Sequence, residues 1–489
     1  MKLISNFFLK NPANWKFWLL LAVIFKGLLF VFCIYKEYHA SKIGTWWGTS
    51  GDTNSYLWPI ENLVDHGKYY LDYRMPGYGI FYLPLYFLFP KVVAINILLA
   101  IQLIVASISN YLLALIARKI FKTDALFYLT FYLYGLSIYS NMFDETVLTE
   151  SFTTSFFIIS IYFFIKFFET KKVIFLIIVG GLLADIIFMR PVFFPTIFFY
   201  WLILIFQFFK QKKSLLKFSF LLFIPFVIFE SSWIIRNYVQ HNVFAPFFAT
   251  IAKSKSSYFY PNATDSGVCS FLQSFGGNID YSAPNAEIRC LGFGENSNFN
   301  DHPIMPSYIY TSKFNADSVA IIRKKFETVL YDTTTTQEQK VAKLEPVYNE
   351  LNSFAASIKK EKPFVYYLIS PAINFKRFFV HSGTYNLFAQ ATNQLNLIQL
   401  GIKIFYTFFY WFVFLLGVIG IFMQFRNLFQ MKITALMLLL VGYTGLIHPI
   451  VLRVCEVRYF VPMFPFVTLF AAYALWKSIL FLLNKFSTN

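Results

Sequence analysis

Apolar stretches of about twenty residues recur along the whole of this 489-residue chain, and short polar segments separate them. A helix of about twenty apolar residues crosses a hydrocarbon core of roughly 30 Å. The pattern therefore predicts about ten membrane-spanning helices, with an eleventh, short or tilted, near 77–90. We expect the spans at 16–35, 94–117, 124–141, 147–166, 173–189, 192–209, 215–235, 398–423, 432–450 and 459–483.

Composition agrees with this pattern. Hydrophobic residues make up 57% of the chain and charged residues 14%, which is too few charges for a soluble domain. The fold class that we predict is an all-α polytopic membrane protein. The first apolar run, from Trp18 to Tyr35, is too long for the core of a signal peptide and no small-residue cleavage site follows it. We therefore expect it to be an uncleaved first span.

The net charge of +17 does not indicate nucleic-acid binding, because the basic residues sit in short clusters between apolar runs. With ten spans these clusters fall on one side, and positively charged short loops stay in the cytoplasm. Both termini are thus predicted to be cytoplasmic, in a multi-pass cytoplasmic membrane protein. The basic residues are Lys10, Lys16, Arg118, Lys119, Lys122, Lys171, Lys172, Lys210, Lys212, Lys213, Lys217, Arg426, Lys432 and Lys485.

One long hydrophilic region, 238–397, is predicted on the opposite, extracytoplasmic side, between a module at 1–237 and final helices at 398–489. Its first half is rich in Gly, Asn, Ser and Pro, which is typical of loops with short strands. Apolar residues at helical spacing predict helices over 318–329 and 336–360, and an aromatic-rich interfacial helix over 364–380. The expected loop domain is therefore mixed.

Two of the four cysteines, Cys269 and Cys290, lie in this region on the side where oxidation is allowed. Their spacing would close a modest loop, so a disulfide is the preferred interpretation, with two free thiols as the alternative. They lack the four-ligand spacing of a zinc site.

The first outer loop carries Asp52, in a Gly-Asp-Thr-Asn-Ser turn before a short helix predicted over 56–65. Asp52 is well placed to cap that helix. The alternative is a catalytic carboxylate, and the acidic residues and arginines predicted on the same side of the membrane favour this second interpretation.

Acidic residues also gather at the start of the span 147–166. Asp144 and Glu145 lie in the tight turn before it, where the helix dipole favours a carboxylate. Glu150 lies one turn deeper, inside the apolar run. An ionisable residue at that depth is costly unless it faces a polar cavity or a partner, so Glu150 is a candidate functional residue.

Four arginines, Arg74, Arg190, Arg236 and Arg458, are predicted at the same outer level. Each alone is explained by lipid headgroup contact or pairing with a carboxylate. As a set they suit an anionic headgroup, because a guanidinium binds phosphate oxygens two at a time. Arginines would stabilise a leaving lipid phosphate while a carboxylate accepts the proton of the attacking group. These are the parts of a transferase for lipid-phosphate-linked sugars.

The order of these motifs resembles the membrane glycosyltransferases of the GT-C fold, in the branch with the protein O-mannosyltransferases and the lipid A aminoarabinose transferase. The resemblance rests on Asp52, Tyr56, His-Gly-Lys-Tyr at 66–69, Arg-Met-Pro-Gly-Tyr at 74–78, Leu-Thr-Glu-Ser at 148–151, Met-Arg-Pro at 189–191, Trp-Ile-Ile-Arg-Asn-Tyr at 233–238 and Arg458-Tyr459. It covers the first seven spans and, weakly, the last.

The resemblance implies a polyprenyl-phosphate-linked sugar donor and a glycan, lipid or protein acceptor. Asp52 would be the general base, Glu150 a second active-site carboxylate, and Arg74 with Arg236 ligands of the donor phosphate. Arg190, Arg458, Tyr56, Asp144 and Glu145 are further candidates. Some members of the family bind a divalent cation near these carboxylates, although no His or Cys cluster here demands one.

The chain departs from the family pattern at two places. Thr53 follows Asp52 where the protein mannosyltransferases have Glu, and Arg-Met-Pro replaces the Lys-Pro-Pro of the aminoarabinose enzymes. The first departure favours the broader bacterial branch, and the second means that the sugar of the aminoarabinose enzymes cannot be carried over. Two alternatives stay open, an oligosaccharide polymerase or ligase and, from a different class, a lipid or ion transporter. A transporter would need charges near the middle of spans, and Lys26 is the main one, unless it snorkels or pairs with a polar neighbour.

Overall fold

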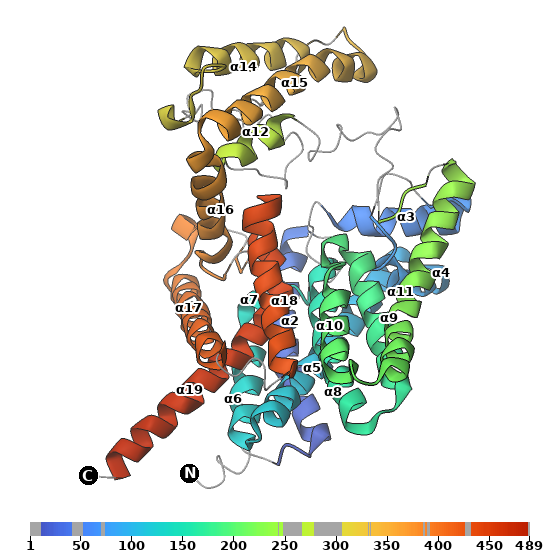
Figure 1. Ribbon diagram of the computed structural model, residues 1–489, viewed down its shortest axis with the longest axis vertical. Coiled ribbons are helices and arrows are strands. Elements are labelled where there is room, and N and C mark those ends of the chain that lie inside the picture. Colours follow the sequence, from blue (N-terminus) through green and yellow to red (C-terminus); the bar gives the residue numbers. More distant parts are fainter. Residues whose placement is uncertain are drawn as a thin grey trace. The chain divides into compact units, whose positions relative to one another are not determined.

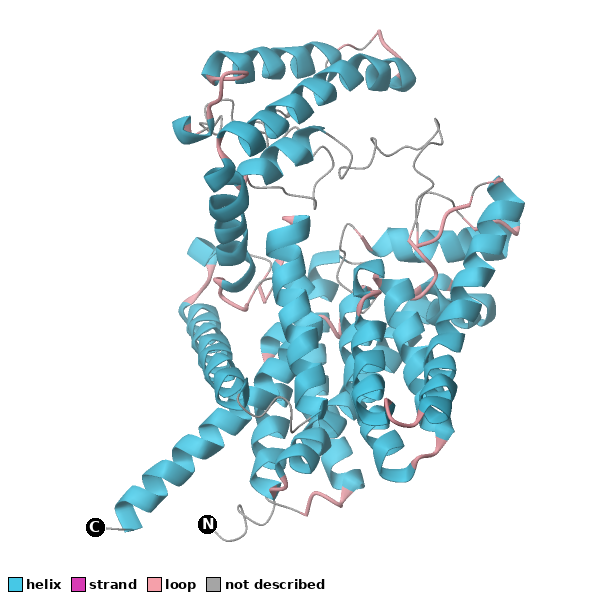
Figure 2. Cartoon of the chain, viewed as in Figure 1, coloured by secondary structure: helices cyan, strands magenta, loops and turns pink. Residues whose placement is uncertain are grey.

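A computed structural model describes residues 11–41, 52–69, 74–242, 244–247, 267–277, 306–330, 332, 334–384, 387–388, 392–425 and 432–487. Helices make up almost all of this part of the chain and no strand occurs in it (Figure 2). The chain divides into two compact units. The first unit comprises Met1–Thr250, Ser382–Thr444 and Arg458–Asn489, and the second comprises Ile251–His381 and Gly445–Val457.

The first unit is a bundle of helices (Figure 1). In chain order they are α2 (Trp15–Ser41), α3 (Thr53–His66), α4 (Gly79–Leu88), α5 (Lys91–Phe121), α6 (Asp124–Gly135), α7 (Ile138–Asn141), α8 (Thr149–Thr170), α9 (Val173–Met189), α10 (Thr196–Phe208), α11 (Lys212–His241), α17 (Leu397–Phe425), α18 (Lys432–Leu446) and α19 (Phe464–Ser487). Two 3-10 turns, η1 (Pro191–Phe193) and η6 (Val457–Met463), precede α10 and α19.

Seven helical segments are long and apolar enough to cross a membrane: Lys91–Phe121, Thr149–Thr170, Pro191–Phe208, Lys212–Gln240, Leu397–Phe425, Lys432–Leu452 and Val457–Lys485. Gly79–Leu88 and Val173–Met189 are shorter apolar helices. The prediction of an all-α polytopic membrane protein is thereby confirmed. The short element expected near 77–90 corresponds to α4, and the helix expected over 56–65 corresponds to α3.

The span expected over 124–141 is not one helix. It breaks after Gly135, and α6 and α7 replace it. The side-chain amide of Asn141 donates hydrogen bonds to the carbonyl oxygens of Tyr134 and Gly135, at 3.3 and 2.9 Å. These bonds satisfy carbonyl groups that a continuous helix would have paired with its own backbone, and so they allow the break inside an apolar environment.

Helices α17 and α19 pack closely because glycines line their contact. A Cβ added at Gly420 would lie 2.1 Å from the carbonyl oxygen of Phe470, and one at Gly417 would lie 2.4 Å from the side chain of Val467. Small residues of this kind let backbones approach in membrane helix pairs. The contact fixes the position of α19 and therefore of the η6 turn that leads into it.

The second unit contains α12 (Gly267–Phe275), η2 (Ser307–Ile309), α14 (Ala316–Leu330), α15 (Gln337–Glu361), a π-helical turn η3 (Val365–Ile369), α16 (Ser370–Phe379) and η5 (Ile447–Leu452). Thr336 and Gln339 form a capping box that starts α15. The apolar face predicted for this helix is buried at Leu344, Val347, Leu351 and Phe354, while the side chain of Val341 lies outside the described residues.

Two other predictions for the region 238–397 cannot be followed in the structure. The short strands expected between 258 and 310 and the Cys269–Cys290 disulfide lie for the most part outside the described residues. Cys455, at the other end of the second unit, is a free cysteine.

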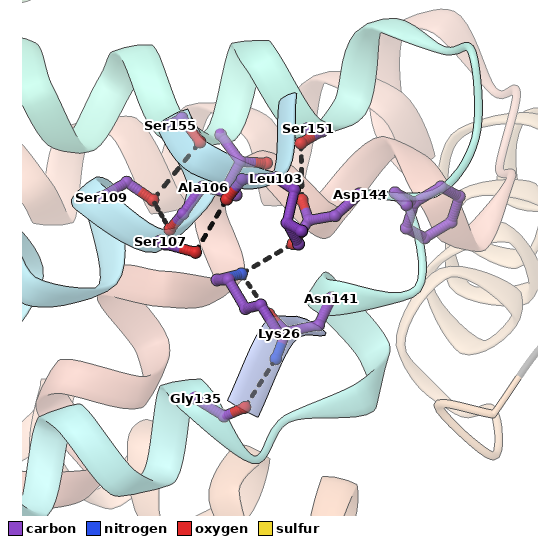
Figure 3. A network of polar contacts seen from close by, with 12 residues as sticks. Lys26, Leu103, Ala106, Ser107, Ser109, Gly135, Asn141, Asp144, Ser151 and Ser155 are labelled. Carbon is purple, nitrogen blue, oxygen red and sulfur yellow. Dashed lines mark hydrogen bonds and ion pairs between the residues drawn. The ribbon is translucent and has the colours of Figure 1, made fainter. Parts of the chain in front are cut away.

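A buried polar network joins α2, the turn after α7 and the start of α8 (Figure 3). Lys26, only 2% exposed, donates hydrogen bonds to Asp144 at 2.7 Å and to Asn141 at 2.8 Å. The other oxygen of Asp144 accepts a hydrogen bond from Ser151 at 2.5 Å. The charge on Lys26 is therefore paired and hydrogen-bonded on both sides, as a buried charge must be.

Gln102 on α5 holds the same turn from the other side. Its amide nitrogen donates to the carbonyl oxygens of Asp144 and Thr146, both at 3.1 Å, and its oxygen accepts a hydrogen bond from Tyr78 at 2.7 Å. Residues 141–148, which lead directly into Glu150, are thus fixed by partners on α2 and α5.

Replacing Lys26 with Met should destabilise the protein by about 3–5 kcal/mol, because Asp144 is left charged and buried without its cation. The double variant Lys26→Met, Asp144→Asn should recover most of this loss. Unfolding of the detergent-purified protein by titration with sodium dodecyl sulfate measures the free energies.

Lys119→Met is the matched control, because Lys119 pairs with Glu169 at an exposed site. Its cost should lie near 0–1 kcal/mol. Equal destabilisation by the two single substitutions, or a double variant as unstable as Lys26→Met, contradicts the pairing.

Candidate functional site

Five charged side chains of the first unit form a chain of alternating sign, which we call the charge chain: Arg74, Asp52, Arg458, Glu150 and Arg190. Arg74 lies 3.0 Å from one oxygen of Asp52, and Arg458 lies 2.6 Å from the other. Arg458 also lies 3.7 Å from Glu150, which forms a second ion pair with Arg190. Four segments far apart in sequence therefore meet through their charges.

Asp52 occupies the N-cap position of α3, but its side chain forms no capping hydrogen bond. The capping role considered for Asp52 is wrong in this respect, because both carboxylate oxygens face arginines instead. Burial alone would raise the pKa of this carboxyl. Arg74, Arg458 and Arg190 outweigh that effect and hold the pKa below its usual value. Asp52 is thus a carboxylate at neutral pH.

Arg74 is held by two tyrosines, Tyr69 of its own loop and Tyr56 of α3. Its backbone carbonyl accepts a hydrogen bond from Tyr69 at 2.6 Å, and its guanidinium lies over the ring of Tyr56 with 5.0 Å to the centroid. The glycine that follows has a packing reason. A Cβ at Gly77 would lie 2.5 Å from the backbone nitrogen of Met189, so glycine lets this loop lie against the end of α9, next to Arg190.

Glu150, in the first turn of α8, is fully buried. Arg190 follows α9 in extended conformation, and its Nε donates to Thr149 at 2.8 Å while the guanidinium pairs with Glu150. Within the described residues, the Oε2 atom of Glu150 is buried and has no hydrogen-bond partner. A buried carboxylate oxygen without a partner is rare in native structures, and it marks this end of the charge chain as incomplete.

The charge chain has an excess of one positive charge, since three guanidinium groups face two carboxylates. The side chains of Arg74 and Asp52 are 44% and 30% exposed, whereas Glu150 is buried. An anion can therefore approach from the Arg74 end, where at least two guanidinium groups are within reach of its oxygens. Such a site is suited to a phosphate.

The fourth arginine proposed for this site, Arg236, is placed elsewhere in the first unit. Its guanidinium lies over the rings of Trp233 and Tyr69, at 4.6 and 5.0 Å, and donates to the Tyr69 carbonyl and to Asn237. Tyr69 also donates a hydrogen bond to the backbone carbonyl of Arg74. Arg236 therefore contacts the site only indirectly, through Tyr69. Its contacts join α11 to Tyr69, and among the described residues they include no member of the charge chain.

The remaining candidates, Tyr56, Asp144 and Glu145, are not members of the charge chain. Tyr56 packs against Arg74 and Tyr78 at the edge of the charge chain. Asp144 belongs to the buried network of Lys26. Glu145 is 9% exposed, and among the described residues its Oε2 has no hydrogen-bond partner.

The oxygens of Asp52 are occupied by guanidinium groups, and among the described residues no three His, Cys, Asp or Glu side chains are grouped so as to hold a metal ion. This donor set does not fit a divalent cation. We therefore derive no step through a metal.

Comparison with known proteins gives no relative: no protein-family model matches this chain, and no curated protein does.

Ser55, Thr149 and Tyr459 contribute to the site, although sequence reasoning assigned none of them a role there; Thr149 and Tyr459 appear in it only as parts of motifs. Ser55 and Thr149 orient Arg74 and Arg190 by hydrogen bonds, and the ring of Tyr459 lies 5.4 Å from the guanidinium of Arg190. Each is a sequence neighbour of a predicted site residue or lies one helical turn from it, which is the only signal that the sequence offers.

Glu145 makes the stability of the protein depend on pH. Burial raises the pKa of its carboxyl to about 8. Because the folded state holds this proton more tightly than the unfolded state, stability falls as pH rises from about 5 to 8, by at most about 1.4 kcal/mol per pH unit. Glu145→Gln should remove this component and stabilise the protein at pH 8 more than at pH 5.

Thermal unfolding of the two proteins between pH 5 and 9 measures the difference. Asp65→Asn serves as the control. It changes an acidic residue of α3 that accepts a hydrogen bond from Tyr86. Parallel pH profiles for wild type and Glu145→Gln contradict the assignment.

Proposed function

We propose that this protein is an integral-membrane glycosyltransferase of the GT-C type, which transfers a sugar from a polyprenyl-phosphate donor to a glycan, lipid or protein acceptor on the extracytoplasmic face. The observation that carries the proposal is the charge chain, with its excess of one positive charge and its carboxylates on either side of Arg458. The resemblance of the sequence motifs supplies the reaction type.

A phosphate group is the natural ligand for the arginines of the charge chain. Arg74 and Arg458 already lie within 3.0 Å of the same carboxylate, so their guanidinium groups converge on one point. A phosphate there would receive hydrogen bonds from both. The polyprenyl tail would lie in the bilayer against the apolar helices of the first unit.

The proposed reaction is an inverting displacement. An acceptor hydroxyl oxygen attacks the anomeric carbon of the sugar and forms the new glycosidic bond. The bond between that carbon and the phosphate oxygen breaks, and the electron pair leaves with the phosphate. Asp52 takes the proton of the acceptor hydroxyl, and Arg74 with Arg458 stabilises the leaving phosphate.

The arginines both bind the donor phosphate and set the pKa of Asp52, and these two roles are coupled. While they pair with Asp52 they hold its pKa low, and a carboxylate with a low pKa is a weak base. A donor phosphate that competes for the same guanidinium groups weakens these ion pairs and adds its own negative charge nearby. Both effects raise the proton affinity of Asp52 when the donor is bound.

A lipid or ion transporter is the second candidate, and one observation favours it. Asp185 on α9 and Glu230 on α11 are buried within apolar helices, and among the described residues each has a side-chain oxygen without a hydrogen-bond partner. Ionisable residues in such positions commonly mark ion or proton pathways. The Lys26–Asp144 pair does not add to this argument, because its hydrogen bonds are complete.

Asp52→Asn should lower the turnover of sugar transfer by about 10²–10⁴-fold, because the proton acceptor is lost. The measurement is the rate of product formation by the purified protein with polyprenyl-phosphate sugars as donors and with membrane glycans and lipids as acceptors. Asp65→Asn, on the same helix but remote from the arginines, should retain the wild-type rate. Full activity in Asp52→Asn removes the base assignment.

The transporter candidate is tested in sealed proteoliposomes that contain labelled lipid-linked sugar on one side. The proposed transferase forms a new glycosidic bond, and chemical analysis of the label detects it. Movement of intact lipid-linked sugar across the bilayer without any new bond, abolished by Asp185→Asn, would establish transport instead.

A further inference from the structure

A groove of about 270 Å³ lies in the first unit where the turn between α5 and α6 meets α17 and α19. Its lining includes Phe121, Gln424, Trp476 and Lys477. The helices concerned can be followed in Figure 1. This end of the spans carries the basic loops, so it lies at the opposite end of α5 and α19 from the charge chain.

Basic side chains gather at the groove and at the α5–α6 turn beside it. Arg118 and Lys119 at the end of α5 are paired with Asp124 and Glu169. In contrast, Lys122 and Lys477 form no ion pair with any described residue. Lys477 lines the groove, and Lys122 lines a neighbouring hollow of about 320 Å³ at the same α5–α6 turn. Two lysines that have no ion-pair partner among the described residues thus flank this turn.

Gln424 provides an independent sign of a ligand. It lies on α17, is 1% exposed and lines the groove, yet its Oε1 atom has no hydrogen-bond partner among the described residues. An unsatisfied buried acceptor is destabilising, because the hydrogen bonds that it makes to water in the unfolded chain are not replaced. A ligand that brings a hydroxyl group into the groove removes that cost.

The other lining residues are those of a membrane interface. Tyr473 stacks on Phe121 at 4.5 Å between ring centroids, and Trp476 lies one turn further along α19. Trp and Tyr are enriched at the level of lipid headgroups. Leu126 and Ile120 add apolar surface on the side of α5 and α6.

We propose that this groove binds the headgroup of an anionic glycerophospholipid, with its phosphate near Lys122 and Lys477 and a headgroup hydroxyl donating to Oε1 of Gln424. Basic pockets between membrane helices are known to take such headgroups. The site is separate from the charge chain, and it does not depend on the proposed transferase reaction. Its ligand is a structural or regulatory lipid of the surrounding bilayer.

Native mass spectrometry of the purified full chain tests the proposal by titration with three lipids of equal chain length. These are phosphatidylglycerol, phosphatidic acid, which lacks the headgroup hydroxyls, and phosphatidylcholine, which is zwitterionic. Wild type should bind phosphatidylglycerol most tightly and phosphatidylcholine most weakly. A wild-type protein that binds all three equally overturns the proposal.

The double variant Lys122→Gln, Lys477→Gln should bind phosphatidylglycerol about 25-fold more weakly, since each basic residue near a lipid phosphate contributes roughly fivefold. The matched control, Lys212→Gln with Lys213→Gln, removes two exposed lysines from the start of α11. Equal losses in both double variants show general surface attraction only and contradict a site.

Gln424→Leu should lower the affinity for phosphatidylglycerol to that for phosphatidic acid and leave the latter unchanged. Unaltered discrimination between these lipids removes Gln424 from the site. Soluble glycerol phosphate distinguishes the two sources of the phosphate. Displacement of the bound lipid by equimolar glycerol phosphate would mean that the groove serves a soluble phosphate, and the lipid assignment would be wrong.

Discussion

The mutual neutralisation of Asp52, Glu150 and their three arginines is the interaction on which this site depends. A fully buried carboxylate such as Glu150 is stable in its charged form only beside a cation, and Arg190 and Arg458 supply it. Each arginine comes from a different part of the chain. The charges therefore tie the first outer loop, α8, the end of α9 and the turn before α19 to one another.

The buried network around Lys26 shows the same physics in a completed form. Lys26 and Asp144 form an ion pair, and Asn141 and Ser151 complete their hydrogen bonds. These contacts give no indication of a ligand. The charge chain differs because its five members carry three positive and two negative charges, and because Oε2 of Glu150 has no hydrogen-bond partner among the described residues. Incomplete pairing, more than the presence of charge, separates a candidate site from a structural network.

Much of the fold is predictable because membrane-spanning helices require long apolar runs, and such runs are visible in the sequence without any knowledge of distant residues. The break between α6 and α7 is not, since it depends on the amide of Asn141 reaching back to carbonyl groups. The sequence predicts Arg74, Arg190, Arg236 and Arg458 at one level as ligands of a phosphate. The structure brings the first, second and fourth to Asp52 or Glu150 and places Arg236 on aromatic rings. Arg458 pairs with Asp52 over 406 positions, and no local pattern distinguishes such a partner from Arg236 on its aromatic rings.

The most direct measurement is the affinity of Asp52→Asn for a short-chain polyprenyl monophosphate, determined by calorimetry with the purified protein. If Asp52 and the phosphate compete for Arg74 and Arg458, the substitution frees both guanidinium groups and should tighten binding severalfold, although it slows transfer. Arg458→Gln should weaken binding in the same assay. Unchanged or weaker binding by Asp52→Asn would contradict the account, because the arginines would then not be shared between the carboxylate and a phosphate.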